Sequence, residues 1–287
     1  MLTRRTALAS GLALGACSHR REPTNAERIE GLLRVLEAEV GGRIGVAALD
    51  TSTGARISYR GERRFAMCSS FKWLLAAVAL QRLNSDETLP IAQSDMIFNS
   101  PITGEHVGGA MSVEALCEAT VVTSDNTAAN LLLRRLGGPQ RFRAYLMNYV
   151  DTVTRIDRYE PELNENAPGD RRDTTTPDAM VRVMNRLLVE GDGLRRENRE
   201  RLLGWMVACR TGLDRLRGGF PPDWRAGDKT GTSDGERNAT NDVAIAWPPS
   251  KSGPILVACF MSNSVVGLPA RKAAHARVGR MIAAAWG

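Results

Sequence analysis

Segments with the residue pattern of β-strands occur near both ends of this chain, and a long helical stretch separates them. Residues 44–49 and 56–59 have this pattern near the N-terminus, as do 223–229, 242–247 and 255–261 near the C-terminus. A strand is stable only when it pairs with other strands, so we expect an α/β (α+β) fold. In this fold class, one antiparallel sheet is built from both chain ends and flanked by helices, with an all-α lobe inserted between its two parts.

The chain between the two groups of strands is mainly helical, from residue 69 to about residue 206. Helical spacing of apolar residues predicts helices over 72–83, 113–119, 127–136, 139–148 and 177–190. The same pattern predicts one helix before the first strand, over 29–40, and one after the last, over 269–286. Residues 157–173 follow neither period and contain Pro161 and Pro168, which predicts an ordered loop.

The first 17 residues have the pattern of an export signal. Arg4 and Arg5 precede an apolar run over 7–16, far shorter than the roughly 20 residues that a membrane span needs. The arginine pair resembles a twin-arginine signal, and residues 14–17 resemble a lipobox, in which Cys17 carries a lipid. An ordinary cleaved signal is the alternative. We expect export to the periplasm, with membrane attachment only through a lipid on Cys17.

The patterns divide the chain into five segments. We expect an export signal with a lipobox pattern, a linker, a discontinuous α/β lobe and an all-α lobe that includes the loop 158–173. Their predicted bounds are 1–17 for the signal, 18–25 for the linker, 26–62 and 207–287 for the α/β lobe, and 63–206 for the all-α lobe.

The composition argues against several classes of function. The net charge is +6, but the basic residues are scattered and only 5% of residues are aromatic, so nucleic acid is not an expected partner. The three histidines, His19, His106 and His275, form no cluster, which argues against a zinc hydrolase and against a Ser-His-Asp triad. We expect no metal and no cofactor.

Three short motifs occur in order along the chain. They are SxxK from Ser69 to Lys72, SDN from Ser124 to Asn126, and KTG beginning at Lys229. The pattern SxxK, or the looser pattern SxN that SDN fits, is expected about once by chance in a chain of this length, so the order and setting of all three carry the interpretation.

The first motif suits nucleophilic catalysis. Ser69 and Lys72 are three residues apart, so at the start of a helix they share one face. A serine becomes a nucleophile when a base lies beside it, and a lysine in little water near a second cation loses its proton readily. The free N–H of Ser69 at the helix start could also stabilise an oxyanion. The alternatives are a helix N-cap for Ser69 and a solvated charge for Lys72.

With these motifs, the chain resembles the class A serine β-lactamases over its length after the signal. Residues 158–164 and 171–177 match the two ends of the family's Ω-loop almost residue for residue. The resemblance implies that Glu160 activates the hydrolytic water, that Asn164 helps to hold this water, and that Arg158 and Asp173 close the loop by an ion pair.

The resemblance also implies a mechanism: hydrolysis of the amide bond of penicillins and cephalosporins through a serine acyl-enzyme, which confers antibiotic resistance. Lys72, Glu160 through water, or both would deprotonate Ser69, and Ser124 would pass a proton to the ring nitrogen. Backbone N–H groups of Ser69 and Thr232 would form the oxyanion hole. The remaining implied groups bind substrate: Asn126 contacts the acylamide side chain, and Lys229, Thr230, Gly231, Thr232 and Arg215 surround the carboxylate.

Some positions depart from the family pattern. Ala76 and Ser233 stand where some members have cysteines that pair with Cys117 and Cys68, so we expect no disulfide at either place. Asn99 stands where an aromatic residue often guards the pocket entrance.

Other functions share the three motifs. A penicillin-binding D,D-peptidase has the same nucleophile but lacks an efficient deacylating base, and Glu160 and Asn164 argue against it. A penicillin-binding sensor domain would need transmembrane and signalling segments, and a lipoprotein binding module would need none of the three motifs. The expected partners are therefore small β-lactam substrates, and the resemblance implies a monomer.

Overall fold

The computed structural model describes residues 22, 24–148, 151–235 and 237–287. The predicted export signal, including Cys17, and most of the predicted linker lie outside these residues. Within the described part of the chain, no helix is both long and apolar enough to cross a membrane.

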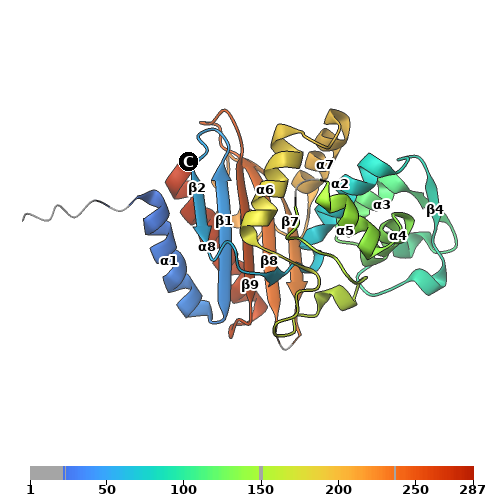
Figure 1. The fold of residues 1–287 in the computed structure, drawn as a ribbon, viewed down its shortest axis with the longest axis horizontal. Helices are drawn as coiled ribbons and strands as arrows, with labels where there is room; N and C mark the ends of the chain where they lie inside the picture. Colours follow the sequence, from blue (N-terminus) through green and yellow to red (C-terminus); the bar gives the residue numbers. More distant parts are fainter. Residues whose placement is uncertain (1–21, 23, 149–150, 236) are drawn as a thin grey trace, which may run out of the picture.

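One five-stranded antiparallel sheet contains strands from both ends of the chain, which confirms the predicted fold class (Figure 1). Its order is β2-β1-β9-β8-β7, so the two N-terminal strands continue the sheet made by the three C-terminal ones. The bounds are β1 Arg43–Asp50, β2 Arg56–Tyr59, β7 Arg225–Ser233, β8 Ala239–Trp247 and β9 Ile255–Ser262.

The central strands are buried along nearly their whole length because helices cover both faces of the sheet. On one face, α1 (Asn25–Val40) and α8 (Leu268–Trp286) share an apolar core with β1, β8 and β9. On the other face, α6 (Pro177–Met184) packs on β1 and β9, and Figure 1 shows it crossing in front of the sheet. The strands of a sheet that is covered on both faces therefore have continuous apolar sequences, without alternation of apolar and polar residues.

The helix α1 begins four residues earlier than its apolar pattern, at Asn25. The Thr24 hydroxyl accepts a hydrogen bond from the backbone N–H of Glu27, and the Glu27 carboxylate accepts one from the N–H of Thr24. This capping box satisfies backbone donors that would otherwise lack partners, and it sets the start of the helix.

The remaining helices form a lobe beside β7, on the right of the sheet in Figure 1. At its centre, α2 is buried on nearly all faces, as its Ala-rich sequence predicts. The helix α7 was not predicted as a separate element. The bounds are α2 Lys72–Arg82, α3 Val113–Val122, α4 Asn126–Arg135, α5 Pro139–Met147 and α7 Arg196–Ala208.

The structure adds detail to two predictions for this region. The mainly helical segment 63–206 also contains the strands of two small antiparallel sheets, β3 (Phe65–Ala66) with β6 (Thr174–Thr175) and β4 (Thr88–Pro90) with β5 (Ala110–Ser112). The predicted helix 177–190 is α6 followed by a π-helical turn, Asn185–Glu190. Strands of two or three residues are too short to show a period of two. Short 3₁₀ turns complete the fold at Cys68–Phe71, Gln93–Asp95, Thr103–His106, Glu162–Asn164 and Arg217–Gly219.

Candidate active site

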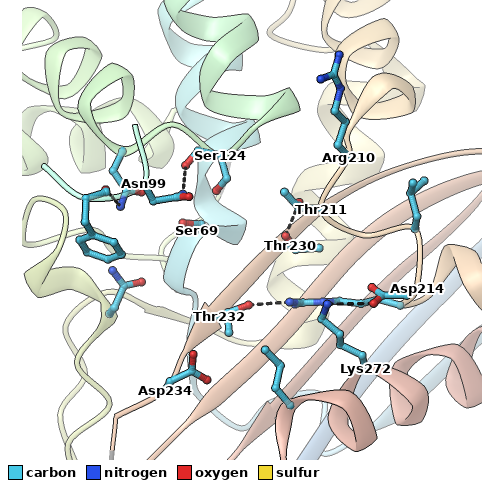
Figure 2. A pocket seen from close by; sticks show the side chains of 16 residues that line it. Ser69, Asn99, Ser124, Arg210, Thr211, Asp214, Thr230, Thr232, Asp234 and Lys272 are labelled. Atoms are coloured by element: carbon cyan, nitrogen blue, oxygen red, sulfur yellow. Dashed lines mark hydrogen bonds and ion pairs between the residues drawn. The ribbon is translucent and has the colours of Figure 1, made fainter. Parts of the chain in front are cut away.

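A cavity of about 660 Å³ lies where β7 meets the helical lobe. Residues from all three motifs line it, and Figure 2 shows Ser69, Ser124, Thr230 and Thr232 among the lining side chains. The lining residues are mostly polar: Ser69, Phe98, Asn99, Ser124, Asn126, Asn164, Arg210, Thr211, Leu213, Asp214, Arg215, Thr230, Thr232, Asp234, Leu268 and Lys272.

Ser69 lies in the 3₁₀ turn Cys68–Phe71, directly before α2, so Lys72 is the first residue of that helix. The turn is held from behind: the side-chain amide of Asn241 on β8 donates to the carbonyl oxygen of Met67 at 2.9 Å. Gly231 on β7 lies against the same carbonyl, since a Cβ there would be 2.4 Å from the Met67 oxygen. This close approach explains the glycine of the third motif.

Ser69, Lys72 and Glu160 form one contact network. The Ser69 hydroxyl donates to the Glu160 carboxylate at 3.2 Å, and the Lys72 ammonium lies 3.1 Å from the same carboxylate oxygen. The side chains of Lys72 and Glu160 are fully buried. The nucleophile candidate thus contacts one candidate base, Glu160, and the second, Lys72, joins the network through the same carboxylate oxygen.

Ser124 joins the two lysines of the site. Its hydroxyl oxygen accepts hydrogen bonds from the Lys72 ammonium at 3.4 Å and from the Lys229 ammonium at 3.1 Å. Ser124 has a φ of +62°, in the left-handed region that non-glycine residues rarely adopt. The adjacent Asp125 holds this turn, because its carboxylate caps α4 and accepts bonds from Ile102 and Thr103.

Burial lowers the pKa of both lysines. It lowers the pKa of Lys72, while the Glu160 carboxylate acts in the opposite direction. The pKa of Lys229 is lowered to about 8, chiefly by burial and also by the positive charge of Lys72. Burial thus lowers the pKa of Lys72, as the sequence-based argument requires, whereas a neighbouring positive charge lowers the pKa of Lys229.

Asn130 positions Glu160 and was not predicted. Its side-chain amide donates to the backbone oxygen of Glu160 at 2.8 Å and its carbonyl accepts from the Glu160 N–H at 2.9 Å. On the other side, the amide of Asn164 donates to the Glu160 carboxylate at 2.5 Å. Asn126 and Asn130 are four residues apart on α4, so their shared helix face was a signal that could have identified Asn130.

Arg158 and Asp173 join the two ends of the loop, as the resemblance implied. The Arg158 guanidinium contacts the Asp173 carboxylate at 2.6 Å, and this carboxylate also accepts from the N–H groups of Asp157 and Arg158. Asp173 is fully buried, and burial raises its pKa against these interactions.

Arg215 lies under the far end of the cavity. It is buried, and its guanidinium donates to the backbone oxygens of Gly231 and Asn241 and to the hydroxyl of Thr232 at 2.7 Å. Arg210, Thr211, Asp214 and Lys272 stand around this end in Figure 2 and were not predicted. Arg210, Thr211 and Asp214 come from the segment after α7, and only the fold brings Lys272 of α8 to them.

The opposite rim is formed by Phe98 and Asn99. The Asn99 amide donates to the backbone oxygen of Ser124 at 3.1 Å, while the exposed Phe98 ring lines the cavity mouth. Asn126 lines the cavity too, although its side chain contacts the Lys72 ammonium and the Phe98 carbonyl. An aromatic side chain is therefore present at the entrance, one residue before the expected position.

The described residues include no disulfide and no metal-binding cluster. The four cysteines of the described chain, Cys68, Cys117, Cys209 and Cys259, are buried and unpaired. Among the described residues, no group of histidine, cysteine, aspartate and glutamate side chains could hold a metal ion.

Comparison with known proteins is consistent across sequence and structure. The family model described as "Beta-lactamase enzyme family" matches residues 26–286. Beta-lactamase L2 of Stenotrophomonas maltophilia is 42% identical over 251 residues, 86% of this chain and 82% of that protein. A β-lactamase of Streptomyces fradiae is 40% identical over 298 residues, 98% of this chain and 96% of that protein.

Two solved structures share the fold closely. An ancestral class A β-lactamase has a TM-score of 0.87 and 50% identity, covering 90% of this chain and 100% of that one. A β-lactamase from Xanthomonas campestris pv. campestris has a TM-score of 0.89 and 42% identity, covering 92% of this chain and 99% of that one. With the three motifs gathered around one cavity, these matches show that the chain belongs to the class A β-lactamase family.

Proposed function

We propose that this enzyme hydrolyses the amide bond of β-lactam antibiotics, penicillins and cephalosporins, with Ser69 as the nucleophile, and so confers resistance to them. The observation that carries the proposal is the contact of the Ser69 hydroxyl with Glu160, whose carboxylate also contacts Lys72. In this proposal, Lys72 or Glu160 serves as the base for acylation of Ser69, and Glu160 serves as the base for deacylation.

In the first step, Ser69 attacks the lactam carbonyl carbon. Its proton passes to neutral Lys72, or to Glu160 through a water molecule, as Oγ forms the new bond. The carbonyl oxygen becomes an oxyanion that accepts hydrogen bonds from the backbone N–H groups of Ser69 and Thr232. The C–N bond then breaks, and the ring nitrogen takes a proton from Ser124. The proton that left Ser69 passes through the Lys72 ammonium to Ser124, whose hydroxyl both lysine side chains contact.

In the second step, water hydrolyses the acyl-Ser69 ester. Glu160 takes a proton from this water, and the hydroxide equivalent attacks the ester carbonyl. The Ser69 oxygen leaves and takes from Glu160 the proton that came from the water, so both residues return to their starting states. Asn164 supports the proposal because its amide already holds the Glu160 carboxylate at 2.5 Å and lines the cavity.

The substrate carboxylate is assigned to the Lys229 end of the cavity. Thr230 and Thr232 present hydroxyl groups there, and Arg215 lies behind Thr232. Gly231 allows β7 to lie close to the Ser69 turn. Asn126 also lines the cavity and contacts the acylamide side chain of the substrate in this proposal. Burial destabilises the charged forms of these cations, and a bound carboxylate stabilises them. Binding of the substrate carboxylate at this end is therefore favourable.

A turnover experiment separates this function from that of a D,D-peptidase. Purified enzyme should hydrolyse many equivalents of nitrocefin and benzylpenicillin, and Ser69→Ala should abolish turnover. A single stoichiometric burst would indicate a peptidase or sensor and would overturn the proposal. Substantial turnover by the alanine variant would instead show that the nucleophile is a different residue.

We also infer that the protein is a monomer of two lobes, with the division predicted from the sequence, and that it is exported to the periplasm with a lipid on Cys17. The charged start, the short apolar run and the lipobox pattern support export and lipidation. Mass spectrometry of the mature N-terminus should find a lipid-modified Cys17. An unmodified N-terminus after residue 17 would contradict lipidation and leave export standing.

A further inference from the structure

A second cavity, of about 490 Å³, lies behind the Ω-loop and is separate from the proposed catalytic groups. Residues at the start of β1, before β3, at the end of the Ω-loop and in the β7–β8 connection line it. Its volume is in the range of small-molecule sites. We call it the rear cavity, and its charged lining residues are Arg43, Arg63, Arg64, Asp170, Arg171 and Arg237.

None of the five arginines of the rear cavity forms an ion pair with a carboxylate among the residues that the structure describes, although the more distant Glu37 and Asp151 raise the pKa of Arg43 and Arg64. Arg43 donates to the Ser262 hydroxyl and stacks on the Phe65 ring, and Arg64 donates to the carbonyl of Val153 and the hydroxyl of Thr174. These contacts are all neutral. Arg60, close in sequence, shows the contrast, since its guanidinium pairs with Glu37 at 2.7 Å.

The single carboxylate of the rear cavity does not neutralise these arginines. Asp170 pairs with Arg172 at 2.8 Å and lies 4.0 Å from Arg158, and neither of those arginines lines the cavity. These interactions lower the pKa of Asp170 to about 2, so it is fully ionised and already paired at neutral pH. The cavity therefore carries a large excess of positive charge.

The arginines are close enough to repel one another. Burial lowers the pKa of Arg43, and the charges of Arg60, Arg237 and Arg63 lower it further. Burial and the charge of Arg171 act on Arg64 in the same direction. Guanidinium groups gathered in a concave site without anionic partners gain free energy when a multivalent anion enters, because each can donate two parallel hydrogen bonds to it.

We propose that the rear cavity binds a small multivalent anion of the phosphate class, such as a diphosphate group. The volume exceeds that of one phosphate, and five guanidinium groups from four segments can surround two linked phosphates. A soluble diphosphate and the phosphate headgroup of an anionic lipid offer the same chemistry. The proposal is independent of the hydrolytic activity.

An anion in this cavity would link two parts of the molecule. Arg171 belongs to the Ω-loop, whereas Arg43 begins the strand β1 of the main sheet. An anion that contacts both ties the loop to the sheet. Because it binds the folded chain only, it should also raise the melting temperature by a few degrees at saturation.

The test is calorimetric titration of the full-length purified protein with inorganic pyrophosphate at low ionic strength. The double variant Arg63→Gln/Arg171→Gln removes two exposed arginines of the cavity that make no side-chain hydrogen bond or ion pair with the described residues. We expect it to weaken pyrophosphate binding by about tenfold or more and to lose the rise in melting temperature. Turnover of nitrocefin by this variant reports that the fold and the proposed catalytic groups are intact.

The matched control is Arg34→Gln/Arg196→Gln, which removes the same charge from highly exposed positions on α1 and α7. It should bind pyrophosphate within about twofold of the wild type. A parallel arm measures binding to phosphatidylglycerol vesicles, and vesicle binding alone, lost in the Arg63/Arg171 variant, would assign the anion to a lipid headgroup. Absence of all binding, or equal binding by the cavity variant and the wild type, would overturn the proposal. The cavity variant and the wild type would also bind pyrophosphate equally if it bound only to the cations of the active site.

Discussion

Replacing Glu160 by glutamine removes one negative charge and one proton acceptor from the centre of the site. The side chain keeps its size, and the backbone of residue 160 stays held by Asn130 at 2.8 and 2.9 Å. The amide cannot take a proton from water, so deacylation loses its base. A positioned general base accelerates a reaction about 10²- to 10⁴-fold, so we expect deacylation to slow by this factor, or by about 3 to 5 kcal/mol in activation free energy.

Acylation should suffer much less, for a reason that the contacts supply. The Glu160 carboxylate raises the pKa of Lys72, while burial lowers it. Without the carboxylate, the buried Lys72 is closer to neutral and better able to take the proton of Ser69. The acyl-enzyme should therefore form and then accumulate.

Intact-protein mass spectrometry after rapid mixing with benzylpenicillin measures this directly. Glu160→Gln should gain the mass of one benzylpenicillin within the dead time and keep it over many wild-type turnover times. The control is Glu162→Gln, two residues along the same loop, where the side chain is exposed and should turn over normally. If Glu160→Gln turned over at the wild-type rate with no adduct, Glu160 would not be the deacylating base, and the contact between Ser69 and Glu160 would have no catalytic meaning.

Three further expectations follow from the site. Asp173→Asn should lower the free energy of unfolding by about 3 kcal/mol, measured by urea denaturation, because it breaks an ion pair with a fully buried carboxylate; an unchanged value would contradict the role of this pair in closing the loop. kcat/KM for benzylpenicillin should fall as pH rises through about 8, because Lys229 then loses the positive charge that binds the substrate carboxylate. Lys229→Arg should remove this fall, and a flat profile for the wild type would argue against the assignment. Asn130→Ala should reduce turnover at least tenfold while Ser69 remains acylated by benzylpenicillin, because Glu160 loses both hydrogen bonds to its backbone; normal deacylation would show that Asn130 does not position Glu160.

The parts of the site that lie in short motifs were predictable because the chain folds them locally. Ser69 and Lys72 are one helical turn apart and contact the same carboxylate, and Ser124 and Asn126 flank the start of α4. The sheet was predictable for a related reason, since a long apolar strand such as β9 has few alternatives to pairing.

The remaining parts depend on contacts between segments far apart in the sequence. Asn241 holds the Ser69 turn from a distance of 174 residues, and nothing around it in the chain indicates that contact. Arg210 and Lys272 reach the cavity from different elements, so their charges could be placed only once the packing of α8 was known. The strands β3 and β6 hold two residues each, which is below the length at which a pattern can be recognised.

The position of β1 between β2 and β9 has a consequence for how the protein forms during synthesis. Val46 pairs with Cys259, so the ribosome must add more than two hundred residues before the inner edge of β1 finds its partner. Until then, β1 and β2 can form only a hairpin, which is marginally stable alone and leaves an apolar edge open to other chains. Contacts of such long range slow folding and lengthen the exposure. Truncations that remove β9 should therefore yield insoluble chains, although the whole proposed catalytic set lies before it.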